Sequence, residues 1–266
     1  MRSMKKILLS VFAFVLFSSV GFAHEFWLDP VSFFSKNACV RFRVGEHFSG
    51  NNWSGNFEKV RLLEVLNHTD RSTSNAQQML PNPGDSLQFS LPFTGTQLLV
   101  YNGSNSYIEL PASEFNAYLQ DDGLTDIAAW RKANGQDTAR SREYYQRSVK
   151  TLLQNGTQLT PCNYPTELPL DIVPLQHPYS LTKAGSISFQ VYFQQRLLKQ
   201  ALIRTWHISS SGKLTAGSIA MTDGSFTLPV TPDGKWMVSL VKMVPNNADD
   251  KADWQSYWGS FTWGYY

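Results

Sequence analysis

The sequence predicts a mainly β protein with a helical insertion, built as two antiparallel β-sandwich-like domains joined by a short helical segment. Three observations lead to this fold class. Apolar and polar residues alternate over short runs in residues 24–110 and again in residues 157–266, as they do in half-buried strands. In residues 111–156 apolar residues instead recur at helical spacing. Finally, 42% of the residues are hydrophobic and only 17% are charged, so the chain has ample material for a core.

Residues 1–23 have the pattern of a secretory signal peptide, and we expect cleavage after Ala23. Basic residues precede an apolar run at 7–17, and Gly21 and Ala23 supply the small residues of a cleavage site. The run is shorter than the ~18 apolar residues of a membrane-spanning helix. An uncleaved membrane anchor is the alternative interpretation. We therefore expect a periplasmic protein without a transmembrane helix in its mature chain.

The N-terminal β-domain is predicted to cover residues 24–110. Short apolar or alternating runs predict strands at 40–44, 60–66, 87–91 and 98–101. Turn residues separate these runs at 50–52, 81–84 and 102–103.

The helical segment is predicted to cover residues 111–156 and to hold three helices. The first ends at Gly123, and the second runs from Thr125 toward Gly135. The third is expected over 137–154, where the pair Glu143 and Arg147 would lie four residues apart on one helix face. The carboxylates that precede Gly123, those of Asp121 and Asp122, are interpreted as a solvated helix end.

The C-terminal β-sandwich domain is predicted to cover residues 157–266. Alternating runs predict strands at 187–193, 226–230 and 236–244. The aromatic-rich stretch 254–266 is interpreted as a final strand that packs large rings into a core.

Two cysteines occur in the chain, at positions 39 and 162. An exported protein folds in an oxidising compartment, so we expect a Cys39–Cys162 disulfide, with two separate thiols as the alternative. A pair so far apart in the sequence does not match a zinc motif.

The charge balance excludes one large class of partner. The chain has 23 Lys and Arg against 21 Asp and Glu, and three of the basic residues belong to the signal peptide. The mature chain is therefore nearly neutral and lacks the basic surface that nucleic-acid binding requires.

Catalytic motifs are not apparent, but the cleavage site creates one distinctive group. The sequence contains no nucleophile elbow, P-loop or dinucleotide-binding fingerprint. Cleavage after Ala23 makes His24 the first residue, which then offers its α-amine and its imidazole Nδ1 as two nitrogen ligands. A second histidine would complete a three-nitrogen set that favours copper, with nickel, cobalt and zinc as further candidates.

His47 is the first choice for this second ligand, because it follows the 40–44 strand at a point where a loop can meet the start of the chain. His207 is the second choice. We expect His68 to lie in a solvated turn and His177 in a linker. A purely structural role for these histidines is the alternative interpretation.

Several motifs resemble a known family. These are the stretch His24-Glu25-Phe26-Trp27-Leu28-Asp29-Pro30, the stretch Val44-Gly45-Glu46-His47-Phe48 and the stretch Asp253-Trp254-Gln255-Ser256-Tyr257. The chain is similar to exported bacterial proteins of unknown function that are often labelled as the periplasmic component of a nickel/cobalt ABC importer. The resemblance implies a metal-linked role outside the cytoplasm, carried by His24 and His47, with a membrane metal transporter as a partner.

The sequence is therefore compatible with three functions. The first is a periplasmic metal-binding protein for uptake or homeostasis of nickel, cobalt or copper. The second is a metal-free β-sandwich module that binds a carbohydrate or a protein. The third is a copper-dependent oxidase, which would also require an open coordination position and redox turnover. We expect the first of these.

Overall fold

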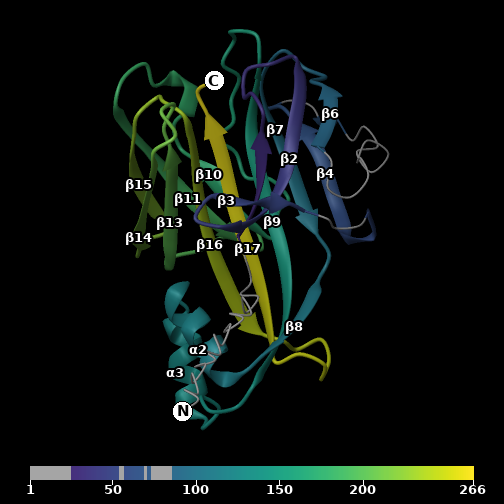
Figure 1. Cartoon of the computed structure of the whole chain (residues 1–266), viewed down its shortest axis with the longest axis vertical. Helices are drawn as coiled ribbons and strands as arrows, with labels where there is room; N and C mark the ends of the chain where they lie inside the picture. Colours follow the sequence, from purple (N-terminus) through teal and green to yellow (C-terminus); the bar gives the residue numbers. More distant parts are fainter. Residues whose placement is uncertain (1–24, 54–56, 69–70, 73–85) are drawn as a thin grey trace, which may run out of the picture.

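The computed structural model describes residues 25–53, 57–68, 71–72 and 86–266 (Figure 1). The predicted signal peptide, His24 and the predicted turn at 81–84 lie outside these residues. The described chain is mainly β, with two α-helices, α2 (Ala112–Asp121) and α3 (Thr125–Ala133). Neither helix has the length and apolar content that a bilayer crossing requires, and no other helix within the described residues has them.

The described strands form three sheets, and most of the predicted strands lie within them. Their bounds are β1 (Glu25–Pro30), β2 (Asn37–Glu46), β3 (Ser49–Asn52), β4 (Val60–Leu66), β5 (Arg71–Ser72), β6 (Ser86–Ser90), β7 (Gly95–Gly103), β8 (Ser106–Leu110), β9 (Ser141–Asn155), β10 (Leu170–Pro174), β11 (Gly185–Phe193), β12 (Arg196–Leu197), β13 (Ala201–Ile208), β14 (Leu214–Met221), β15 (Ser225–Val230), β16 (Lys235–Pro245) and β17 (Trp254–Gly264). Two short 3₁₀ helices, η1 (Phe57–Lys59) and η2 (Pro178–Ser180), complete the described elements.

A nine-stranded sheet runs through the middle of the molecule. Its strand order is β14-β13-β16-β17-β9-β7-β4-β5, and β8 also pairs with β9. The pairing of β17 with β9 is parallel, from Trp254 opposite Glu143 to Thr262 opposite Thr151. Strands from residues 24–110, 111–156 and 157–266 all contribute, so the three predicted segments share one sheet.

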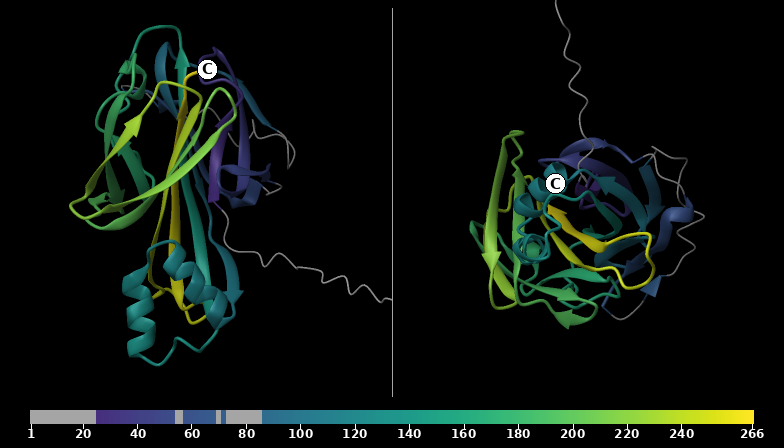
Figure 2. Two further views of the ribbon diagram at one scale, coloured as in Figure 1. Left: turned by 60° about the vertical axis from the view of Figure 1, so that its left-hand side comes forward. Right: turned by 90° about the horizontal axis from the view of Figure 1, so that it is seen from below.

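The two smaller sheets pack on opposite faces of this central sheet. The first contains β1, β2, β3 and β6, and the second contains β10, β11, β12 and β15. Strand β7 shows how the alternation works: Leu99 and Tyr101 join the core under the first small sheet, whereas Leu98 and Val100 join the core under the second. The result is a sandwich-like arrangement of three layers, with β9 and β17 between the two outer groups (Figure 2).

The two helices cover one end of the central sheet. Figures 1 and 2 show α2 and α3 beside the ends of β16 and β17 that lie farthest from the small sheets. Phe115 and Leu119 of α2 are fully buried there against Val241, Met243 and Trp254. The aromatic-rich end of the sequence thus forms β17, which supplies rings to the core at both of its ends.

The prediction of a third helix over 137–154 is wrong, because this region forms the long strand β9. Its apolar residues face two different cores: Val149 and Leu153 lie under the first small sheet, whereas Leu152 lies under the second. A strand buried on both faces loses its alternation, and here the remaining spacing imitates a helical stripe. Glu143 and Arg147 are consequently about 13 Å apart along the strand and form no helical pair.

The predicted Cys39–Cys162 disulfide is also wrong, because both cysteines are free thiols. Cys39 lies on β2 between Ala38 and Val40, which face the core, so its own side chain points away and donates to Ser86 Oγ at 3.3 Å. Cys162 is buried in the core on the other side of the central sheet. A disulfide needs the two Cβ atoms about 4 Å apart, and a whole layer separates them here.

Candidate functional site

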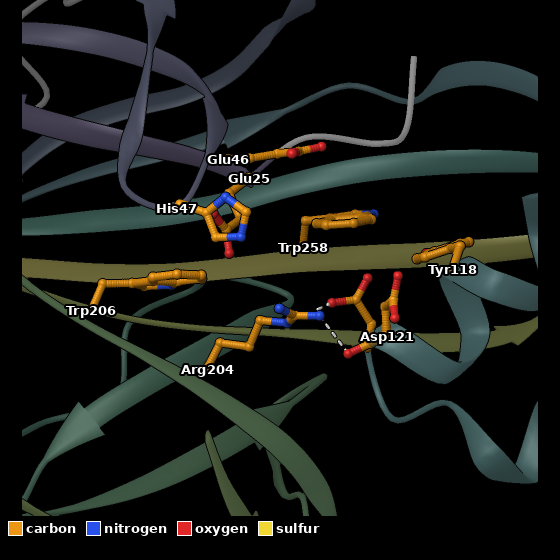
Figure 3. A pocket seen from close by; sticks show the side chains of 9 residues that line it. Glu25, Glu46, His47, Tyr118, Asp121, Arg204, Trp206 and Trp258 are labelled. Atoms are coloured by element: carbon orange, nitrogen blue, oxygen red, sulfur yellow. Dashed lines mark hydrogen bonds and ion pairs between the residues drawn. The ribbon is translucent and has the colours of Figure 1, made fainter. Parts of the chain in front are cut away.

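A cavity of about 380 Å³ lies where β1, the β2–β3 turn, the end of α2 and β13 meet (Figure 3). Its lining combines carboxylates, aromatic rings, one arginine and one histidine. The lining residues are Glu25, Glu46, His47, Tyr118, Asp121, Asp122, Arg204, Trp206 and Trp258.

His47 enters this cavity from a strained hairpin turn. Glu46 pairs with Ser49, which leaves His47 and Phe48 as a two-residue loop, and both have positive φ values of 55° and 56°. Such turns favour Asn or Gly, and other side chains pay of order 1–3 kcal/mol per residue. Burial of the Phe48 ring, at 5.6 Å from the Trp27 ring, offsets this strain. The turn then holds the His47 ring 5.6 Å from Trp206, facing the cavity.

Glu25 is the first residue of β1 and pairs with Gly45 on β2. A Cβ atom on Gly45 would lie 2.2 Å from the Ser49 carbonyl oxygen, so only glycine lets the hairpin close beside Glu25. Burial raises the pKa of Glu25 to about 8, although Arg204 opposes this effect. Oε2 of Glu25 is buried and has no hydrogen-bond partner among the described residues. The cavity wall therefore contains a carboxyl group that is neutral at pH 7 and has an unused oxygen.

Arg204 of β13 ties the cavity to the helical end of the molecule. Its Nε donates to Asp122 Oδ1 at 3.2 Å, and its guanidinium also donates to the backbone carbonyl of Asp121. Burial raises the pKa of Asp122 to about 6, even with this cation beside it. Both aspartates line the cavity, but Asp121 is exposed, as expected for a solvated helix end, whereas Asp122 is half-buried.

A buried carboxyl group lies behind the aromatic wall of the cavity. The Tyr118 and Trp258 rings stack at 5.6 Å between centroids, with an interplanar angle of 14°. The Tyr118 hydroxyl donates to Oε1 of Glu143 at 3.3 Å. Burial raises the pKa of Glu143 to about 7. The cavity is thus surrounded by carboxyl groups with elevated pKa values, a feature typical of functional sites.

The sequence-predicted ligands are only partly brought together. His47 lines the cavity, whereas His207 stacks on Trp236 at 3.9 Å between centroids, with Nε2 2.9 Å from the Asp233 carbonyl oxygen. His207 follows Trp206 on β13 and so points to the opposite face of the sheet. His24 lies outside the described residues.

Most of the cavity's lining residues could not be predicted from the sequence, because they come from elements far apart in the chain. Arg204, Trp206, Trp258 and Tyr118 have no shared motif or spacing. The stretch that begins at Glu25 and the stretch that contains Glu46 and His47 carried a recognisable signal, and Asp121 and Asp122 were noted only as a helix end.

Metal-binding potential within the described residues is incomplete. Among them no three His, Cys, Asp or Glu side chains are grouped as a metal site requires. His47 and Glu25 provide one imidazole and one carboxyl group at the same cavity. Further ligands would have to come from outside the described residues.

Comparison with known proteins gives the family of the chain. A search of curated proteins finds no match. A family model, described as a domain of unknown function, matches residues 21–243 and so covers most of the sequence. The chain therefore belongs to the DUF4198 family.

Proposed function

We propose that the processed protein binds a transition metal, copper, nickel or cobalt, outside the cytoplasm and serves its uptake or homeostasis. One observation carries this proposal: Glu25 and His47 line the same cavity. His24 is bonded directly to Glu25, so their Cα atoms are about 3.8 Å apart. Signal-peptide cleavage after Ala23 would therefore create a free amine close to that cavity.

The chemistry of the ligands supports this assignment. The α-amine and imidazole of His24 together with the His47 imidazole would supply three nitrogens, a set that suits Cu²⁺ best and also Ni²⁺ and Co²⁺. An α-amine has a pKa near 8, so losing its proton to a metal costs little at neutral pH. A membrane transporter is the partner that such a carrier would serve.

The test is a metal titration of protein that begins at His24, compared with protein that carries one extra alanine before it. The extra residue turns the amine into an amide nitrogen and should weaken Cu²⁺ or Ni²⁺ binding by at least about tenfold. His47→Asn should weaken binding as well, and asparagine tolerates the positive φ at this position. The matched control is His68→Asn, which removes an exposed imidazole and should leave affinity unchanged.

Equal affinity of the processed and extended proteins would reject the N-terminal metal site. If neither protein binds metal, the metal-free binding module becomes the better hypothesis. A copper-dependent oxidase would require metal binding together with redox turnover under a reductant and oxygen, which the same preparations can be assayed for.

A further inference from the structure

A second cavity, of about 250 Å³, differs from the first in its charge. Aromatic rings, hydroxyl groups and two cations line it, and none of its lining residues within the described chain is acidic. These residues are Trp53, Lys59, Tyr101, Gly103, Ser104, Ser106, Tyr145 and Arg147.

Arg147 is the central group of this cavity. Its guanidinium carbon lies 4.8 Å from the centroid of the Phe26 ring and 5.4 Å from that of Tyr145. Within the described residues it has neither a hydrogen bond nor an ion pair, although a guanidinium has five donor N–H groups. Burial lowers the pKa of Arg147, yet an arginine keeps its charge at neutral pH.

Three other partly buried arginines each form an ion pair with an aspartate. Arg43 pairs with Asp29 at 3.3 Å, Arg142 with Asp253 at 2.7 Å and Arg204 with Asp122 at 3.2 Å. Arg147 is half-buried as these arginines are, so water solvates its charge only in part. Among the described residues, Arg147 therefore has aromatic contacts and no anionic partner.

Aromatic rings pack around Arg147 on one side of the cavity. The centroid of the Phe26 ring lies 5.5 Å from that of Trp53 and 5.2 Å from that of Tyr101. These contacts pack the Trp53 and Tyr101 rings, which line the cavity, against the core. At the edge, Lys59 is held by its hydrogen bond to the Asn105 carbonyl oxygen at 3.0 Å. A ligand would thus meet one guanidinium, one peripheral ammonium, hydroxyl groups and aromatic surfaces.

We propose that this cavity binds a small organic monoanion, with its carboxylate on Arg147 and its apolar body against Trp53, Tyr101 and Tyr145. A planar guanidinium matches a carboxylate in two parallel hydrogen bonds. The volume lies below the ~300–1,000 Å³ of sites for drug-sized ligands, so the ligand is small. The site does not involve His24 or His47, and it stands whether or not the protein binds a metal.

The test is calorimetric titration of the protein with benzoate and phenylacetate. Benzamide, which has the shape of benzoate without its charge, and inorganic phosphate, which has charge without an apolar body, serve as comparison probes. We expect saturable binding of at least one carboxylate, with benzamide and phosphate about tenfold weaker or more.

Variants of the lining residues test whether the carboxylate binds in this cavity and on Arg147. Arg147→Met should weaken carboxylate binding by about tenfold or more, whereas Arg147→Lys should retain part of it. Arg140→Met is the matched control, because Arg140 is exposed and pairs with Glu109 on the surface. If Arg147→Met does not fold, Ser106→Phe keeps the arginine and fills the cavity, and it should abolish binding while circular dichroism stays unchanged.

Three results would overturn the proposal. The first is absence of binding by both carboxylates to the unmodified protein, with or without binding of phosphate. The second is benzamide binding as tightly as benzoate. The third is retention of full affinity in Arg147→Met or in a folded Ser106→Phe variant.

Discussion

Glu143 places a carboxyl group behind the stacked rings of Tyr118 and Trp258, where it is only 1% exposed. Ser256 and Tyr118 donate to its Oε1, whereas Oε2 has no partner among the described residues. Burial raises its pKa from an ordinary 4.5 to about 7. Between these two pH values the folded protein keeps a proton on Glu143 that the unfolded chain releases.

This single group makes stability fall as pH rises. The folded state binds more protons than the unfolded state, so the contribution is complete below pH 4.5 and is lost as pH rises through about 7. We expect a loss on the order of 3 kcal/mol from this residue. Glu143→Gln cannot ionise, so its free energy of unfolding should decline less between pH 5 and pH 8. Urea denaturation at several pH values checks this.

The exposed Glu109→Gln variant is the control, and its pH profile should follow that of the unmodified protein. Glu25 and Asp122 also have raised pKa values and are present in both proteins, so the difference between the two profiles reports Glu143 together with its coupling to Asp122. Parallel profiles for Glu143→Gln and the unmodified protein would contradict the assignment.

Part of the candidate site could be predicted from the sequence, and part of it could not. The hypothesis that His47 meets the start of the chain rested on a loop position, and His47 does line a cavity with Glu25. Arg204 and Asp122 could not be predicted there, because their ion pair joins residues 82 positions apart. Asp122 looked like any helix-end carboxylate, and only the approach of β13 buries it.

Among the elements, β9 shows most clearly how context overrides local pattern. Its inner half is buried on both faces, so polar residues there need partners from other strands. Lys150 pairs with Asp171 of β10, and both side chains are 1% exposed. Asp171 also accepts a hydrogen bond from the Thr166 backbone N–H at 2.6 Å. The pair therefore links the central sheet to the second small sheet.

We expect Lys150→Met to lower the free energy of unfolding by about 3–5 kcal/mol, because Asp171 would remain buried without its cation. The double variant Lys150→Met/Asp171→Asn should recover at least half of this loss, since the asparagine oxygen can still accept from Thr166. Urea denaturation of both variants measures the two values. A double variant no more stable than Lys150→Met, or a loss below about 1 kcal/mol in Lys150→Met itself, would contradict this role.

For the whole molecule, the central sheet joins regions that the sequence separates. The strand runs were predictable because alternation is local, and so was the mainly β class. The pairing of β17 with β9 was not predictable, because it joins segments more than 100 residues apart and no local pattern encodes a parallel partner. The two predicted sandwiches are present as two cores, but they lie on opposite faces of one sheet.

A shared sheet predicts a single unfolding transition. Each core depends on β7 and β9, so neither can lose its packing without exposing the other. Urea unfolding followed by tryptophan fluorescence and by far-ultraviolet circular dichroism should therefore give coincident curves. Two separated transitions would instead indicate that the halves fold independently.

The central position of β17 also bears on when a nascent chain can fold. Residues 141–155 and 235–245 leave the ribosome before residues 254–264, yet β17 lies between the strands they form. Until its synthesis is complete, β9 and β16 have open backbone edges that invite wrong pairing with other chains. The central sheet can therefore close between β9 and β16 only after residues 254–264 have been made.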